Sequence, residues 1–270
     1  MTRGSYFRRA REGVVLFLLF ALPLVLSPLG YQYIKEVFVL AIVSFLVILW
    51  AVEIFVKGEE NIRIPLPLLG GLLLLAMASL SLIHSGNPLI GQESFGLLLF
   101  FLLFYLLLVN IISSECQARR LLGALFLAGT LAAIYALMQY FGFDLLPYPH
   151  RLSPAGPGSM VSTMGNKNYL AGFLSYLFLP ALILLLKSRG WWRLAIFISL
   201  GVIYTTILAS GTRGAWLGLA VAIFFLAMGL LSLPARRSCQ AEPSLAYSLS
   251  DHACLDHSAL HLPNSPERAI

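Results

Sequence analysis

Eight apolar runs, each about as long as a membrane-spanning helix, follow one another along a chain of 270 residues. A helix needs about 20 mostly apolar residues to cross the hydrocarbon core of a bilayer. Hydrophobic residues make up 59% of the chain and charged residues 11%, which excludes a disordered chain, a coiled coil and an average soluble enzyme. The sequence therefore predicts an all-α fold, a polytopic bundle of about eight transmembrane helices. The expected spans are residues 14–30, 37–56, 66–83, 95–112, 120–141, 169–186, 194–210 and 215–233.

The basic residues alternate between the two sides of these spans. The N-terminus, every second loop and the C-terminal tail hold 14 of the 18 Lys and Arg residues, and the intervening loops hold 4. Because basic loops stay in the cytoplasm, both termini are predicted to be cytoplasmic. The first run follows the basic residues Arg8, Arg9 and Arg11, as the apolar stretch of a signal peptide follows its basic region. Its end offers no small-residue cleavage site, so this helix is expected to be retained.

The chain is expected to divide into three parts. Residues 1–13 form a cytoplasmic N-terminus, and residues 14–233 form the transmembrane domain, with a periplasmic loop over 142–168. That loop contains four prolines and four glycines, which exclude a regular helix through its centre. Residues 234–270 are polar and have no periodicity. Two interpretations of this atypical tail stay open: a genuine disordered tail, or the product of translation in a shifted frame or of a truncated gene.

Arg213 stands between the last two spans on the predicted periplasmic side, within the sequence Gly211-Thr212-Arg213-Gly214. A guanidinium held between two closely joined apolar helices needs an anionic partner, and it fits phosphate oxygens in a bidentate manner. The alternative is an arginine that caps the loop and extends to the interface. Gly214 and Gly218 fit a small-xxx-small motif for helix packing.

The sixth span begins at Gly165-Asn166-Lys167-Asn168 on the same predicted side. Asparagines at this position can cap a helix, and a helix N-terminus beside a lysine is a plausible phosphate site. Simple capping is the alternative.

Other polar residues have both a functional and a structural interpretation. Gln139 closes the fifth span and either contacts a substrate or bridges helices, and His150 and Arg151 offer a base and a second cation or are exposed spectators. Lys35 and Glu36 are expected to form a local ion pair of little energetic weight. Glu53 lies near the cytoplasmic end of its span, where it is expected to reach the interface. Because no span has a charge near its middle, an ion-coupled transporter is disfavoured.

Three segments together resemble the O-antigen ligase and O-antigen polymerase superfamily of bacterial inner-membrane proteins. They are Ala132 to Gly142, Gly165 to Gly172, and Thr212 to Gly218, and the resemblance extends over about residues 30–233. It implies a multi-pass protein of the bacterial inner membrane that takes part in lipopolysaccharide or polysaccharide biosynthesis. Such a glycosyltransferase transfers a glycan from a polyprenyl-diphosphate carrier, such as undecaprenyl diphosphate, to a lipid or glycan acceptor at the periplasmic face.

The resemblance also assigns roles to residues. Arg213 matches the family's arginine that contacts the diphosphate, and it is the expected catalytic residue. Asn166 and Asn168 match the Gly-Asn-x-Asn motif, with Lys167 between them. We expect these three residues, together with Gln139, Arg151 and His150, to bind the substrate. No metal and no other cofactor is implied, and the expected partners are the lipid-linked donor, the acceptor and membrane lipids, without nucleic acid.

The chain departs from the family beyond its last apolar run. Members of the family continue into a large periplasmic loop with a functional histidine and into further spans, whereas this chain has Arg236 and Arg237 and the polar tail. The enzyme prediction therefore has two alternatives. One is polymerase-like chain extension, and the other is a non-enzymatic remnant or carrier-lipid-binding protein.

Overall fold

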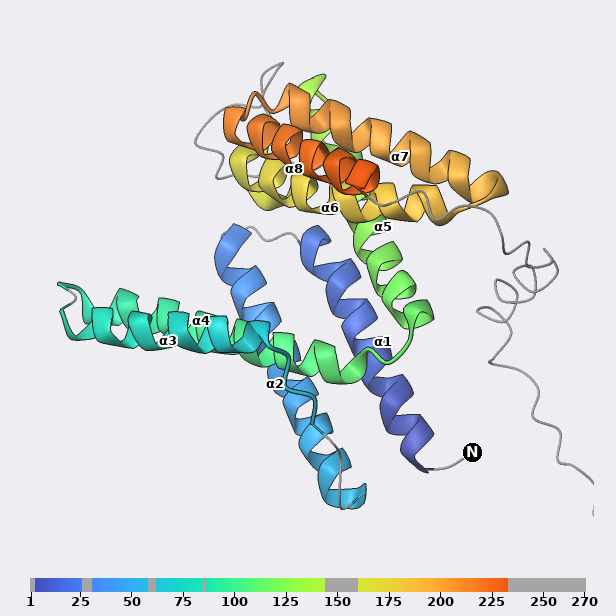
Figure 1. Ribbon diagram of the computed structural model, residues 1–270. Coiled ribbons are helices and arrows are strands. Elements are labelled where there is room, and N and C mark those ends of the chain that lie inside the picture. The colour runs from blue at the N-terminus through green and yellow to red at the C-terminus, as the bar shows by residue number, and fades with distance from the viewer. Residues whose placement is uncertain (1–2, 26–30, 58–61, 85, 144–159, 233–270) are drawn as a thin grey trace, which may run out of the picture. The chain divides into compact units, whose positions relative to one another are not determined.

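The computed structural model describes residues 3–25, 31–57, 62–84, 86–143 and 160–232. Within these ranges every regular element is a helix, as the apolar runs predict (Figure 1). The α-helices in chain order are α1 (Arg3–Leu24), α2 (Tyr31–Lys57), α3 (Pro67–Ile83), α4 (Pro88–Ile111), α5 (Glu115–Tyr140), α6 (Lys167–Lys187), α7 (Gly190–Ala209) and α8 (Arg213–Ser232). A short 3₁₀ helix, η1 (Ser162–Met164), precedes α6.

Five of the described helices are long and apolar enough to cross a membrane. They are α2, α4, α5, α6 and α7, while α3 and the apolar part of α8 are shorter. Many large apolar side chains are exposed on them; Phe55, for example, is 91% exposed. A soluble protein rarely exposes so much contiguous apolar surface, whereas lipid covers it in a membrane. The length of the helices and their exposed surface together indicate a membrane protein.

The chain separates into two compact units, residues 1–224 and 225–270. The described part of the second unit is the C-terminal end of α8. The first unit contains two clusters of buried apolar residues. One is built around Val43, Leu46 and Leu107, and the other around Leu174, Ile203 and Ile207.

Helix α1 begins well before the apolar run at residue 14, because its charged residues find partners on other helices. Arg11 forms an ion pair of 2.9 Å with Glu53 of α2, and neither side chain is more than 6% exposed. Glu53 is therefore buried and paired inside the protein, and its position at the membrane interface stays a prediction. The helix can extend through Arg11 because the charge is paired inside the protein.

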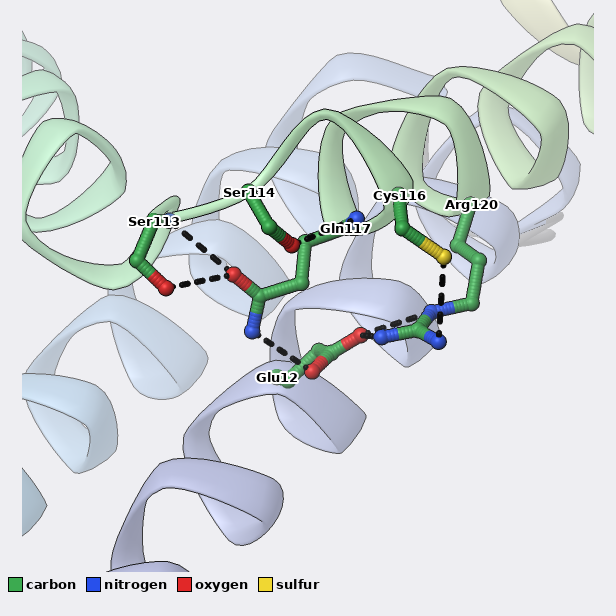
Figure 2. A network of polar contacts seen from close by, with 6 residues as sticks. All are labelled: Glu12, Ser113, Ser114, Cys116, Gln117 and Arg120. Carbon is green, nitrogen blue, oxygen red and sulfur yellow. Dashed lines mark hydrogen bonds and ion pairs between the residues drawn. The ribbon is translucent and has the colours of Figure 1, made fainter. Parts of the chain in front are cut away.

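Glu12 connects α1 to the start of α5 through a network of polar contacts (Figure 2). Its carboxylate accepts hydrogen bonds from Gln117 Nε2 at 2.9 Å and from Arg120 Nε at 2.9 Å. Gln117 Oε1 in turn accepts from the backbone N–H of Ser113 at 2.9 Å, and Ser114 Oγ caps the helix by accepting from Gln117 N at 3.3 Å. This network joins α1 to the start of α5.

Candidate functional site

Helix α6 begins at an asparagine cap that follows a sharp turn. Gly165 has a φ of 71°, a left-handed conformation that glycine adopts without steric cost. The Asn166 side chain then accepts a hydrogen bond from the backbone N–H of Asn168 at 2.8 Å. The capping interpretation of Asn166 is therefore confirmed. Lys167 is the first residue of the helix, and its side chain is exposed beside the positive end of the helix dipole.

Helix α8 also follows a left-handed glycine, and it begins next to the start of α6. Gly211, with a φ of 67°, turns the chain out of α7, and Thr212 immediately precedes the helix. Thr212 Oγ1 donates a hydrogen bond to Asn168 Oδ1 at 3.1 Å, which joins the two helix starts. Trp216 Nε1 donates to the carbonyl of Ile207 at 2.9 Å and so ties α8 to α7. Two helix N-termini, each with an exposed cation at its first position, consequently lie together.

A groove of about 670 Å³ runs from this pair of helix starts between α6 and α8. Asn168 and Thr212 line its polar end, and Leu179, Ile183 and Leu219 are among the residues that line its apolar remainder. Between residues 168 and 183, α6 rises by about 22 Å. The groove therefore offers a long apolar surface that begins at Asn168 and Thr212, the neighbours in sequence of the exposed cations Lys167 and Arg213.

Glycines widen this groove instead of joining two helices. Gly172 of α6 and both Gly214 and Gly218 of α8 line it, and a Cβ atom added at any of them would meet no atom within 4 Å. Within the described part of the chain no helix packs against Gly214 or Gly218, so the predicted packing motif is not formed there. Their lack of side chains leaves space beside α6.

The segment that leads into α6 is anchored to α5 by Gln139. This side chain is 1% exposed, and its Oε1 accepts hydrogen bonds from the backbone N–H groups of Ser162 at 2.7 Å and Val161 at 3.1 Å. Ser162 Oγ donates to the carbonyl of Ala132 at 2.6 Å. Ser162 has a φ of 50°, which is uncommon for a residue with a Cβ atom and persists only where surrounding contacts enforce it.

The same segment is anchored to α1 and α2 on its other side. Thr163 Oγ1 donates to the carbonyl of Pro23 at 2.6 Å. Lys35 Nζ lies 3.4 Å from that carbonyl and 3.3 Å from Met164 Sδ. The expected local ion pair of Lys35 with Glu36 is wrong, because among the described residues Lys35 Nζ contacts Pro23 and Met164. Glu36 lines a separate groove between α2 and α4. Three helices thus hold η1 in place.

The structure brings together Arg213, Asn166, Lys167 and Asn168 of the predicted site residues. Gln139 contacts the segment that leads into α6, and these contacts give it a positioning role; its contact with a substrate stays a prediction. His150 and Arg151 lie outside the described residues. Sequence reasoning missed Ser162 and Thr163, whose only signal was their place just before the Gly-Asn motif.

The described residues contain no group of three or more His, Cys, Asp and Glu side chains that could hold a metal ion. Cations, amides and helix N-termini are the groups that the site offers, and all of them suit an anion. Comparison of the chain with protein-family models, with curated proteins and with solved structures gave no match.

Proposed function

We propose that this protein transfers a glycan from a polyprenyl-diphosphate carrier to an acceptor hydroxyl at the periplasmic face of the bacterial inner membrane. One observation carries the proposal: the hydrogen bond between Thr212 and Asn168 joins two cation-bearing helix starts at the polar end of a long apolar groove. A lipid diphosphate has the matching chemistry, with a strongly anionic head on a long apolar chain.

In this proposal the apolar groove holds the first part of the polyprenyl chain, and the helix starts hold its diphosphate. The acceptor oxygen forms a bond to the anomeric carbon of the glycan. The bond between that carbon and the diphosphate oxygen breaks, the electron pair leaves with the carrier diphosphate, and the hydroxyl proton passes to a base. Arg213 and Lys167 stabilise the negative charge that develops on the leaving group. Arg213 is the catalytic residue because its guanidinium contacts that group.

The proposal includes about eight membrane spans with both termini in the cytoplasm. The contacts of η1 with the end of α1, the start of α2 and the end of α5 place these helix ends together, as alternating spans require. The basic loops support the assignment of this end to the periplasm.

Two related functions share the same donor. Polymerase-like extension of a chain differs only in its acceptor, and a carrier-lipid-binding protein without transfer needs only the groove and the cations. The groove and the two cation-bearing helix starts beside it support all three functions, and an assay with and without an acceptor separates them.

The experiment measures binding of a polyprenyl diphosphate to the full chain in lipid nanodiscs. Replacing Arg213 with alanine should weaken binding by roughly tenfold to a hundredfold, because a charge-assisted hydrogen bond contributes about 1.5–3 kcal/mol. Arg193→Ala, at the other end of α7, is the matched control and should bind as the unchanged protein does. Equal binding by both variants would refute the assignment of the diphosphate site.

A second pair of variants tests the groove. Gly218→Leu places a side chain in the space that the glycine leaves open, and it should weaken binding by roughly tenfold without lowering thermal stability. Gly201→Leu, on α7 where a Cβ atom also meets nothing within 4 Å, is its control. Addition of an acceptor glycolipid then shows transfer if the protein is an enzyme. Binding without transfer supports the carrier-binding alternative.

A further inference from the structure

Lys35 is a charged residue in the apolar helix α2, and its contacts leave its ammonium group poorly satisfied. Its side chain is half-buried, and Nζ has two contacts, the Pro23 carbonyl at 3.4 Å and the Met164 thioether at 3.3 Å. The first distance is long for a hydrogen bond and the second acceptor is weak, whereas an ammonium group has three donors. Within the described ranges no carboxylate lies within ion-pair distance of it.

A partly buried ammonium group without an anion is costly, and proteins normally pair such charges. The partner that Lys35 lacks is therefore expected to come from a ligand. The location of Lys35 indicates which ligand. Met164, which Nζ contacts, ends η1, and only Gly165 and Asn166 separate it from Lys167 at the start of α6. The Cα atoms of Met164 and Lys167 are three residues apart and therefore lie at most about 11 Å from each other.

The segment between the two lysines has a defined geometry. Gln139 and Thr163 anchor η1 on opposite sides, and Gly165 makes a left-handed turn into α6. The distance between Lys35 and the helix starts is consequently set by the fold and does not depend on a loop that adjusts freely. A ligand with two adjacent anionic groups can use such a fixed separation, whereas a ligand with one cannot.

We propose that Lys35 is a specificity-determining residue that supplies a third positive charge and selects a diphosphate over a monophosphate. This inference rests on the proposed function, because it names the part of the donor that the site distinguishes. Arg213 and Lys167 bind one phosphate at the helix starts, and Lys35 binds the second phosphate from the side of α2. No bond is made or broken by Lys35.

The test compares binding of farnesyl diphosphate and farnesyl monophosphate to the full chain in nanodiscs. Lys35→Met keeps the length of the side chain and removes its charge. We expect this variant to lose roughly tenfold in diphosphate affinity and less than about twofold in monophosphate affinity. Lys35→Arg should restore most of the preference. Lys187→Met, an exposed lysine at the far end of α6, is the control and should change neither affinity.

The possible results separate this inference from the proposed function. If Lys35→Met binds the diphosphate as tightly as the unchanged protein, the inference is wrong while the proposed function stands. If the variant loses both affinities equally and melts at a lower temperature, Lys35 is a structural brace and the inference is wrong. If the unchanged protein binds neither lipid, the proposed function and the inference fail together.

Discussion

Replacement of Gln139 with leucine should destabilise the protein more than replacement of any exposed glutamine, because Gln139 satisfies two backbone groups of another segment. Its Oε1 accepts from Ser162 N at 2.7 Å and from Val161 N at 3.1 Å, and the side chain is 1% exposed. Leucine has a similar volume but no acceptor. The substitution therefore leaves two N–H groups without a partner and creates no large cavity.

The magnitude follows from the burial of the two groups. Ser162 is buried, so the loss of its acceptor should cost about 2 kcal/mol, and Val161 is only half-buried, so its loss should cost about 1 kcal/mol. The expected decrease in the free energy of unfolding is thus about 3 kcal/mol. Ser162 should also leave its left-handed conformation, since the contact that enforces it is gone.

Two measurements check this prediction. Reversible unfolding in mixed micelles gives the free energy, and amide hydrogen exchange reports whether the Ser162 N–H loses its protection. Gln92→Leu, at an exposed position of α4, is the control and should change the free energy by less than about 0.5 kcal/mol. If Gln139→Leu unfolds like this control and Ser162 stays protected, the anchoring role of Gln139 is refuted.

Two further predictions concern the packing of the helices. The Glu12 side chain is 12% exposed and that of Arg120 is 44% exposed. Arg120→Met leaves the less hydrated charge, Glu12, without its ionic partner and should lower the free energy of unfolding in micelles by about 2–4 kcal/mol, whereas Glu12→Gln should lower it by about 1 kcal/mol. A larger loss for Glu12→Gln than for Arg120→Met would contradict the burial of these side chains. Gly129→Ala should lower the melting temperature relative to Gly201→Ala, because its Cβ atom would meet Leu177 Cδ1 and the buried Leu177 side chain would have to shift. Gly201→Ala should raise the melting temperature slightly, because helix propensity improves and no atom lies within 4 Å. Equal shifts for the two glycine variants would show that α5 and α6 do not approach closely at Gly129.

The helices themselves follow from local properties of the sequence. Backbone groups in lipid must form their hydrogen bonds within a helix, so an apolar run predicts one wherever it is long enough. The expected spans 169–186 and 194–210 correspond to α6 (Lys167–Lys187) and α7 (Gly190–Ala209) within a few residues. The start of α1 was not predictable in this way, because Arg11 is accommodated by Glu53, which lies on another helix.

Some features of the candidate site also follow from local sequence, and others depend on contacts between distant residues. The order of the motifs and the alternation of the spans predict that Lys167 and Arg213 lie on one side of the membrane, and the residue types at Gly165 and Asn166 predict a capped helix start. Only the tertiary structure decided that Asn168 meets Thr212, that Gln139 supports Ser162, and that Lys35 contacts Met164. Helix formation depends on neighbours a few residues away, which a single sequence displays. Pairing between helices depends on the fit of side chains that are far apart in the chain, and no local pattern records that fit.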